Sequence, residues 1–262
     1  MRLVRRILTT VIVTLAVIFV VVNWVGPVAL SFYAAKKVPS VARVVPAELK
    51  YISVSHAPPT TLSYFGYEFE VPWNDLDESK TKLYPKDSLD KRMAFLYFRS
   101  GLQLVVNAGP PREWAHYFAT DWKLSPPQVE AFMGHEAAMS DYIFLKNLYA
   151  FTPDSMHYWA LSSRLHYHEQ MLLMIKSIAP SKPAETGIFN LQNQSFRGFQ
   201  QGDPQVRQDS LLLSLYSDEG EIEIRLLQKG YRNPAGVTQP EINRIVQSMR
   251  KATPSEVATS PH

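Results

Sequence analysis

The sequence predicts an α+β protein, with an N-terminal transmembrane helix followed by a mostly antiparallel sheet that carries helices packed on one face. Residues 7–35 contain no charged side chain. Beyond them, apolar residues alternate with polar ones in strand-like segments near both ends of the chain, whereas residues 112–178 show helical periodicity. Strands, then helices, then strands and a last helix is the order typical of an α+β domain.

An uncharged apolar run predicts the membrane-spanning helix. Residues 7–25 consist mainly of Val, Ile, Leu, Ala and Phe. As a helix they would span about 28 Å, close to the ~30 Å hydrocarbon thickness of a bilayer. Trp24 lies where an interfacial aromatic side chain is expected. A cleaved signal peptide is the alternative, but its apolar region is shorter and ends at a small-x-small site, so the length favours a retained anchor.

Positive charge near the N-terminus predicts the orientation of this anchor. Arg2, Arg5 and Arg6 abut the apolar run and favour a cytoplasmic N-terminus. Lys36 and Lys37 add positive charge on the far side, but long domains translocate largely regardless of their charge. We therefore expect a single-pass protein of the cell (inner) membrane, whose C-terminal domain is periplasmic or extracellular.

The chain divides into five segments on this interpretation. They are a short basic N-terminus (1–6), the transmembrane helix (7–25), a juxtamembrane linker (26–59), a single α+β globular domain (60–251) and a disordered tail (252–262). The linker is interrupted by prolines, and the tail is small and polar.

Strands are expected first in the globular domain. Apolar and acidic side chains alternate within residues 61–73, which predicts one strand. Residues 74–90 are polar and predict a surface loop. Residues 93–98, apolar on both faces, and residues 102–106 predict a hairpin.

Helices are expected in the middle third of the chain. The predicted helices cover residues 112–120, 126–132, 136–151 and 155–178. Ser125 followed by Pro126 has the pattern of an N-cap with proline at the first helical position. Pro180 and Pro183 stop the last of these helices.

The last third returns to strands and ends in a helix. The predicted strands cover residues 186–191, 195–201, 211–216 and 221–226, and the last two form a hairpin. Thr238 and Glu241 have the spacing of a capping box that begins the final helix.

The two ends of the domain resemble a known family. Residues 64–73 (Tyr-Phe-Gly-Tyr-Glu-Phe-Glu-Val-Pro-Trp) resemble the first core strand of Mog1/PsbP-like domains. The closing hairpin and the helix at 240–250 are similar to the C-terminal ends of those domains. The resemblance implies a non-catalytic binding or assembly module, and it assigns no functional residue.

Composition excludes several classes of function. Removing Arg2, Arg5 and Arg6 from the 27 basic residues leaves 24, which equals the 24 acidic residues. A domain with balanced charge lacks the basic surface that nucleic-acid binding needs. The chain has no cysteine, so disulfides, thiol catalysis and cysteine-ligated metals are excluded.

Known catalytic and metal motifs are incomplete. A zinc-protease helix needs a second His four residues after the His of a His-Glu pair. The pairs at 135–136 and 168–169 have Met139 and Leu172 at that position. A calcium loop beginning at Asp75 would have lysines where it needs Gly and Glu. Ser-x-x-Lys pairs occur at 79/82, 88/91 and 248/251, without the companion motifs of serine–lysine enzymes.

Two further features have alternative interpretations. Asn193-Gln194-Ser195 is a glycosylation acceptor sequence, which matters for a lumenal domain of a eukaryote. Four tryptophans would either line a ligand groove or pack in the core, and core packing is the commoner role; they are Trp73, Trp114, Trp122 and Trp159.

These observations predict a single-pass, membrane-anchored protein with an extracytoplasmic, non-catalytic binding or accessory domain. Its expected partners are the lipid bilayer, through the N-terminal helix, and an envelope protein, with no nucleic acid. No cofactor, metal site or catalytic residue is predicted, and no binding residue is assigned. The alternative is a membrane-tethered hydrolase whose acid and base come from distant segments, for example Glu136 or Glu169 with a histidine.

Overall fold

The computed structural model describes residues 13–15, 17–18, 39–49, 53–85, 92–156, 163–206, 208–227 and 236–252. These residues belong to two compact units. The smaller unit comprises residues 1–43 and 151–179, and the larger comprises residues 44–150 and 180–262.

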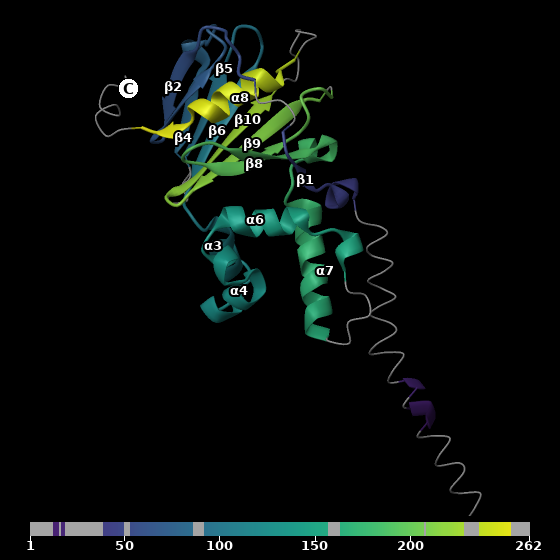
Figure 1. Ribbon diagram of the computed structural model, residues 1–262. Coiled ribbons are helices and arrows are strands. Elements are labelled where there is room, and N and C mark those ends of the chain that lie inside the picture. The colour runs from purple at the N-terminus through teal and green to yellow at the C-terminus, as the bar shows by residue number, and fades with distance from the viewer. Residues whose placement is uncertain are drawn as a thin grey trace, which may run out of the picture. The chain divides into compact units, whose positions relative to one another are not determined.

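The larger unit is built on an eight-stranded sheet (Figure 1). In spatial order its strands are β1 (Pro46–Ala47), β7 (Ile188–Gln192), β8 (Arg197–Gln201), β9 (Ser210–Ser217), β10 (Gly220–Leu227), β6 (Gln103–Gly109), β5 (Arg92–Tyr97) and β4 (Lys82–Pro85). Only the pair of β1 and β7 is parallel among these described strands. The prediction of an α+β fold with a large, mostly antiparallel sheet is confirmed.

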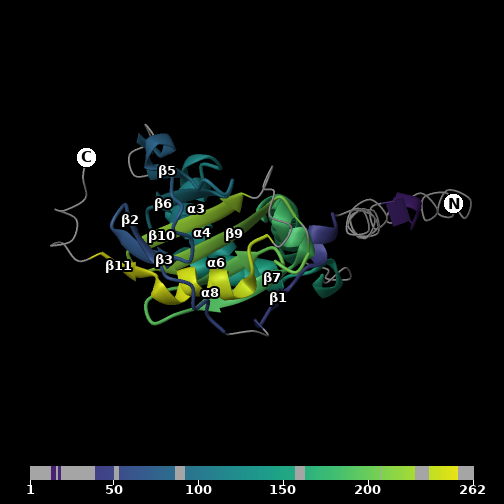
Figure 2. The ribbon, with the colours of Figure 1, turned by 90° about the horizontal axis from the view of Figure 1, so that it is seen from above.

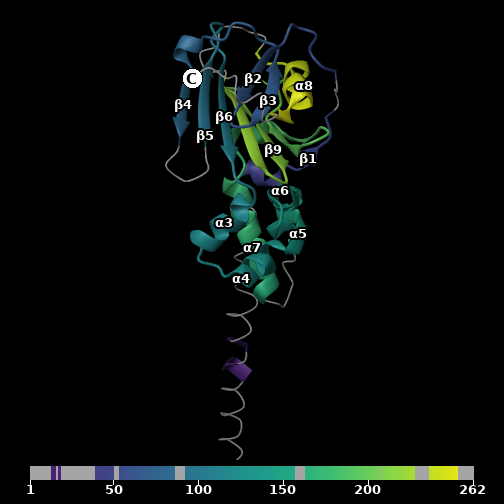
Figure 3. The same cartoon turned by 90° about the vertical axis from the view of Figure 1, so that its left-hand side faces the viewer.

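A second layer covers one face of this sheet (Figures 2 and 3). It consists of a three-stranded sheet, β11 (Arg250–Lys251), β3 (Tyr67–Val71) and β2 (Thr60–Tyr64), together with helix α8 (Gln239–Ser248). Ile242 and Ile245 of α8 are fully buried in the same cluster as Leu213 and Ile224 of the large sheet. Burying an aliphatic side chain of this kind contributes about 1.5–3 kcal/mol, so this layer forms the main core.

Helices also lie against the opposite face of the large sheet. Gln200 and Gln201 are neighbours on β8, so their side chains point to opposite faces. Gln200 exchanges hydrogen bonds with Gln239 of α8, at 2.9 Å in each direction. Gln201 donates to the hydroxyl of Tyr149, in α6 (Asp141–Ala150), at 3.1 Å. The prediction that the helices pack on one face is therefore corrected, because alternate side chains of β8 contact helices on both faces.

The remaining helices of the larger unit follow β6 in the chain. They are α3 (Glu113–Thr120), α4 (Pro126–Met133) and α5 (His135–Ala138), and they lie with α6 near one end of the sheet strands (Figure 1). Ser125 is the N-cap residue of α4 as predicted, with Pro126 after it; its backbone carbonyl accepts from the N–H groups of Gln128 and Val129, and its own N–H and hydroxyl donate to Oε1 of Gln128. The capping box of α8 is also confirmed, with Thr238 donating to Oε2 of Glu241 at 2.7 and 2.9 Å.

Several element boundaries differ from those predicted. The single strand expected over 61–73 is the hairpin of β2 and β3, because Phe65 and Gly66 both have positive φ, 57° and 83°. The helix expected over 136–151 is broken between α5 and α6 at 139–140. The expected loop at 74–90 contributes edge strand β4, and the expected linker contributes β1.

The smaller unit has its own small apolar cluster. Its described elements are the 3-10 turns η2 (Ser40–Arg43) and η4 (Pro153–Ser155) and the helix α7 (Ser163–Ile178). Ala42, Met156 and Leu173 form the cluster, with Phe151 packed against it. Within the helix expected at 155–178, residues 157–162 lie outside the described residues. Trp159 is among them.

Among the charged side chains of this unit whose burial is described, Lys176 is the most deeply buried, at 0% exposure. Its Nζ donates to the backbone carbonyl of Phe151 at 2.5 Å. Burial lowers the pKa of Lys176 to about 8, because removing the ammonium from water disfavours its charged form.

We expect a Lys176→Met variant to be more stable than the wild type at pH 6–7, by about 2 kcal/mol. Because the folded pKa lies below the unfolded value of 10.5, the folded chain bears the full cost of the charge below pH 8. That cost fades as pH rises towards 10.5, so urea denaturation at pH 6.5 and pH 10 should show the advantage shrinking. Lys182→Met, at an exposed position, is the control. An advantage that did not change with pH would contradict the expectation.

Within the described residues, no helix combines the length and the apolar character that crossing a bilayer requires. Most of the predicted anchor at 7–25 lies outside them; residues 13–15 and 17–18 are helical and exposed.

Candidate functional site

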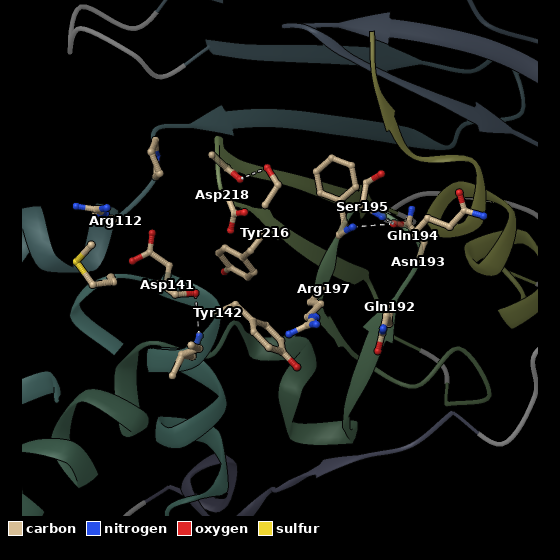
Figure 4. Close-up of a pocket in the computed structure, with 17 residues that line it drawn as sticks. Arg112, Asp141, Tyr142, Gln192, Asn193, Gln194, Ser195, Arg197, Tyr216 and Asp218 are labelled. Atoms are coloured by element: carbon tan, nitrogen blue, oxygen red, sulfur yellow. Dashed lines mark hydrogen bonds between the residues drawn. The ribbon is translucent and has the colours of Figure 1, made fainter. Parts of the chain in front are cut away.

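A polar cavity of about 420 Å³ opens at one end of the large sheet, where three connections meet the start of α6 (Figure 4). Its walls come from the β6–α3 connection, the residues that lead into α6, the β7–β8 turn and the β9–β10 turn. Cavities of this volume are large enough to hold a small molecule or part of a chain. We call it the first cavity.

Asp141 lines the first cavity and is hydrogen-bonded to the start of α3. Its two carboxylate oxygens accept hydrogen bonds from the backbone N–H groups of Glu113 and Trp114, at 2.8 and 3.0 Å. These are the first two N–H groups of α3, which otherwise have no partner within the helix. The charge also lies at the positive end of the α3 dipole, so Asp141 is committed to holding α3 against α6.

Arg112, the residue before α3, has left-handed backbone angles of φ 61° and ψ 36°. A side chain with a Cβ adopts this conformation at a cost of about 1–2 kcal/mol. Its exposed side chain lines the first cavity. Figure 4 shows Arg112 and Arg197 on opposite sides of this cavity, with Asp141, Tyr142 and Tyr216 between them.

Two buried tyrosines, Tyr216 in the lining of the first cavity and Tyr149 of α6, keep their protons. Burial, followed by the charge of Glu221, raises the pKa of Tyr216 well above its usual value. Burial and the charge of Glu223 likewise raise the pKa of Tyr149. Both hydroxyls are therefore hydrogen-bonding groups at neutral pH, without the tendency to ionise that a general base or nucleophile needs.

Two carboxylates lie close to Gly109. Oε1 of Glu221 and Oε2 of Glu113 lie 2.8 and 3.1 Å from the position that a Cβ on Gly109 would occupy. A larger residue at 109 would displace them. Neither of these glutamates is among the residues that line the cavity.

Asn193 shapes the β7–β8 turn, which forms another wall. Its Nδ2 donates to the carbonyls of Val246 and Met249 at the C-terminal end of α8, at 2.7 and 2.9 Å. Its Oδ1 accepts from the backbone N–H groups of Ser195 and Phe196, both at 2.8 Å. The amide thus ties the turn to α8 and fixes where Gln194 and Arg197 face the cavity. Because both hydrogens of Nδ2 are engaged, the Asn193 amide of the glycosylation acceptor sequence is not available for modification in the folded chain.

A second cavity of about 340 Å³ adjoins the first. Both cavities are lined by Tyr142 of α6 and Gln192 of β7. Tyr142 is held by stacking on Phe199 of β8, with ring centroids 5.4 Å apart and an interplanar angle of 21°. The second cavity adds Lys146 of α6 and Asn190 of β7 to the walls. We call the two cavities together the two-cavity groove.

The sequence-predicted candidates lie elsewhere. His135 and Glu136 are exposed on α5, and Nδ1 of His135 contacts Glu130 at 2.8 Å. Glu169 and His168 lie on α7 in the smaller unit, where burial lowers the pKa of His168 and the charge of Glu169 opposes that shift. The structure brings neither pair into the two-cavity groove.

The weaker motifs take structural roles. Oδ2 of Asp75 accepts a bond from the N–H of Ser100 at 2.6 Å. Hydrogen bonds from Ser79 and Lys80 lower the pKa of Asp77. Ser248 donates to backbone carbonyls of α8. Among the described His, Asp and Glu residues, no group of three is placed to hold a metal ion.

The described tryptophans pack against other rings. Trp73 meets Phe98 edge to face, with centroids 5.7 Å apart, and its Nε1 donates to Glu241 at 3.1 Å. Trp114 and Trp122 belong to an aromatic cluster centred on the buried ring of Phe118. None of these three lines the two-cavity groove.

Comparison of the chain with protein-family models, curated proteins and solved structures finds no match.

Proposed function

We propose that the chain is a single-pass membrane protein whose globular part is a non-catalytic binding or accessory module outside the cytoplasm. In this proposal residues 7–25 anchor it in the bilayer and the two-cavity groove receives its ligand or an envelope-protein partner. The lining of the groove is the observation that carries the binding role.

The groove offers hydrogen-bonding groups without a proton-transfer pair. Gln192, Gln194 and Ser195 line the first cavity with exposed amide and hydroxyl side chains. Its one buried carboxylate, Asp141, is engaged by the N-terminus of α3. The raised pKa of Tyr216 keeps that hydroxyl protonated. Such a lining suits recognition of a polar ligand better than acid–base chemistry, which needs a group that titrates near the working pH.

Two sequence features support the rest of the proposal. The run at 7–25 has the length and composition of a bilayer span, and its described residues are helical with exposed apolar side chains such as Val13 and Ile18. The resemblance of the two ends of the domain to Mog1/PsbP-like domains favours a binding or assembly module, and those ends contain β3, the β9–β10 hairpin and α8.

The membrane part is tested by fractionation and protease treatment. We expect the intact chain to sediment with membranes, and a C-terminal tag to be digested when protease is added to unbroken spheroplasts. A tag that is protected until the spheroplasts are lysed would show that the C-terminal domain lies in the cytoplasm, contrary to the proposal. An intact chain that stays in the supernatant would contradict the proposal that residues 7–25 anchor it in the bilayer.

The binding part is tested by photo-crosslinking in cells. A photoreactive amino acid replaces Gln194, which lines the first cavity, or Gln205, an exposed glutamine outside the groove. We expect a crosslinked product from position 194 that position 205 does not give. Adding Ser195→Trp, which fills the cavity, should abolish that product. Equal products at both positions, or a product that survives the filled cavity, would contradict a ligand site here.

A further inference from the structure

The two-cavity groove is lined by three cationic side chains and three carboxylates, and its cationic side chains are the less engaged of the two sets within the described residues. Its three cationic side chains are Arg112 and Arg197 in the first cavity and Lys146 in the second. All three are exposed, and none forms a hydrogen bond or ion pair with the described part of the chain. By contrast, Arg244 pairs with Glu70 at 2.7 Å.

The acidic groups of the groove are mostly engaged. Asp141 accepts two backbone N–H groups of α3. Oε1 of Glu48, in the second cavity, accepts a bond from Nδ2 of Asn190 at 2.7 Å. Asp218, on the exposed β9–β10 turn, is the remaining carboxylate among the described lining residues. Hydrogen bonds from neutral donors leave these carboxylates charged, but they occupy two of the three, whereas all three cationic side chains are available to contact a ligand, which favours an anionic one.

The groove is elongated, because its two walls run along regular elements. Tyr142 and Lys146 are four residues apart on α6, so they lie on one helix face about 6 Å apart along the axis. Asn190 and Gln192 are two residues apart on β7 and point to the same side of the strand. Tyr142 and Gln192 line both cavities, whereas Lys146 and Asn190 line the second cavity alone.

We propose that the two-cavity groove binds an elongated anionic ligand, with carboxylate or phosphate groups placed beside Arg197 in the first cavity and Lys146 in the second. Tyr142, which lines both cavities, presents its ring to the ligand. Arg112 adds a second guanidinium on the opposite side of the first cavity (Figure 4). This inference rests on the proposed function, because it names the class of ligand for the same groove.

The test measures binding of defined anions to the full-length chain in mild detergent. The probes are tripolyphosphate and a tetraglutamate peptide, with a tetraglutamine peptide as the neutral counterpart. We expect one or both anions to bind, with affinity falling as salt is raised. The double variant Arg197→Gln/Lys146→Gln should weaken binding at least about tenfold, since each lost charge–charge hydrogen bond removes a substantial part of the affinity. Arg197→Lys/Lys146→Arg should retain it.

A matched variant separates the groove from general surface charge. Arg225→Gln removes an exposed arginine on β10 that lies outside both cavities, and it should leave the affinity unchanged. Equal weakening by Arg225→Gln, or tetraglutamine binding as tightly as tetraglutamate, would overturn the inference. So would the absence of binding by both anions. If the crosslink from position 194 persists in Arg197→Gln/Lys146→Gln, the groove binds a ligand that is not anionic, and the binding function stands while this inference falls.

Discussion

A Gly198→Ala variant is expected to lose about 3 kcal/mol or more of its free energy of unfolding, or to fail to accumulate as folded protein. A Cβ at residue 198 would lie 1.9 Å from the carbonyl oxygen of Ser214 and 3.0 Å from Cα of Leu215. Both atoms are backbone of β9, which pairs with β8 on one side and β10 on the other. Relief therefore requires moving a central strand away from one of its neighbours. Urea denaturation of the purified variant measures the loss.

A second glycine provides the matched control for this variant. Gly134, at the end of α4, has no atom within 4 Å of an added Cβ, although its φ of +89° is unfavourable for alanine. Gly134→Ala should therefore lose only about 1–2 kcal/mol, from backbone strain. Similar losses in the two variants would show that the close approach of β8 and β9 is not what requires glycine.

Asn193→Asp is expected to destabilise the folded chain by about 3 kcal/mol at pH 7. The substitution keeps the acceptor for Ser195 and Phe196 but replaces the donor to Val246 and Met249 with a charged oxygen facing two carbonyls. Repulsion of this kind raises the pKa of the new carboxyl in the folded state. The loss is therefore complete above the folded pKa and shrinks as pH falls from there to the unfolded pKa, because the protonated acid can donate again. Thermal unfolding between pH 3.5 and pH 7 records this.

Two controls distinguish this mechanism from a general effect of charge. Asn193→Ala loses the same donor without gaining a titratable group, so its deficit should be nearly independent of pH. Gln194→Asp adds the same charge one residue further on, at an exposed position, and should change stability by less than about 0.5 kcal/mol. A deficit of Asn193→Asp that stayed constant down to pH 3.5 would contradict the role of Nδ2.

Much of the fold follows from local patterns. Alternation of Ile222, Ile224 and Leu226 with polar residues predicts β10, and these three side chains are fully buried in the core. Capping residues predict where α4 and α8 begin. The hairpin inside 61–73 does not follow from the sequence pattern, because Phe65 takes a left-handed conformation that aromatic residues rarely adopt, and Gly66 is the one turn-favouring residue there. The edge pairing of β1 depends on a partner 142 residues away and leaves no local signal.

The candidate site was harder to predict than the fold. Tyr142, Lys146, Asn190 and Gln192 converge only because α6 lies beside β7, and no motif joins these residues in the sequence. The engagement of Asp141 by α3 also depends on tertiary contact. Asn193 did carry a signal, since Asn between two strand-like segments is typical of an Asx turn, and its Oδ1 accepts from the N–H groups of Ser195 and Phe196.

The parallel contact of β1 with β7 makes the domain's response to mechanical load unequal. Force applied to the chain from its N-terminal side acts on β1 before the other strands of the large sheet. Two residue pairs join β1 to β7, Pro46 with Ile188 and Ala47 with Phe189. Glu48 and Leu49 follow β1 directly and line the second cavity. Tension on the chain would therefore separate β1 from β7 and displace Glu48 and Leu49 from the second cavity before it disrupted the antiparallel strands.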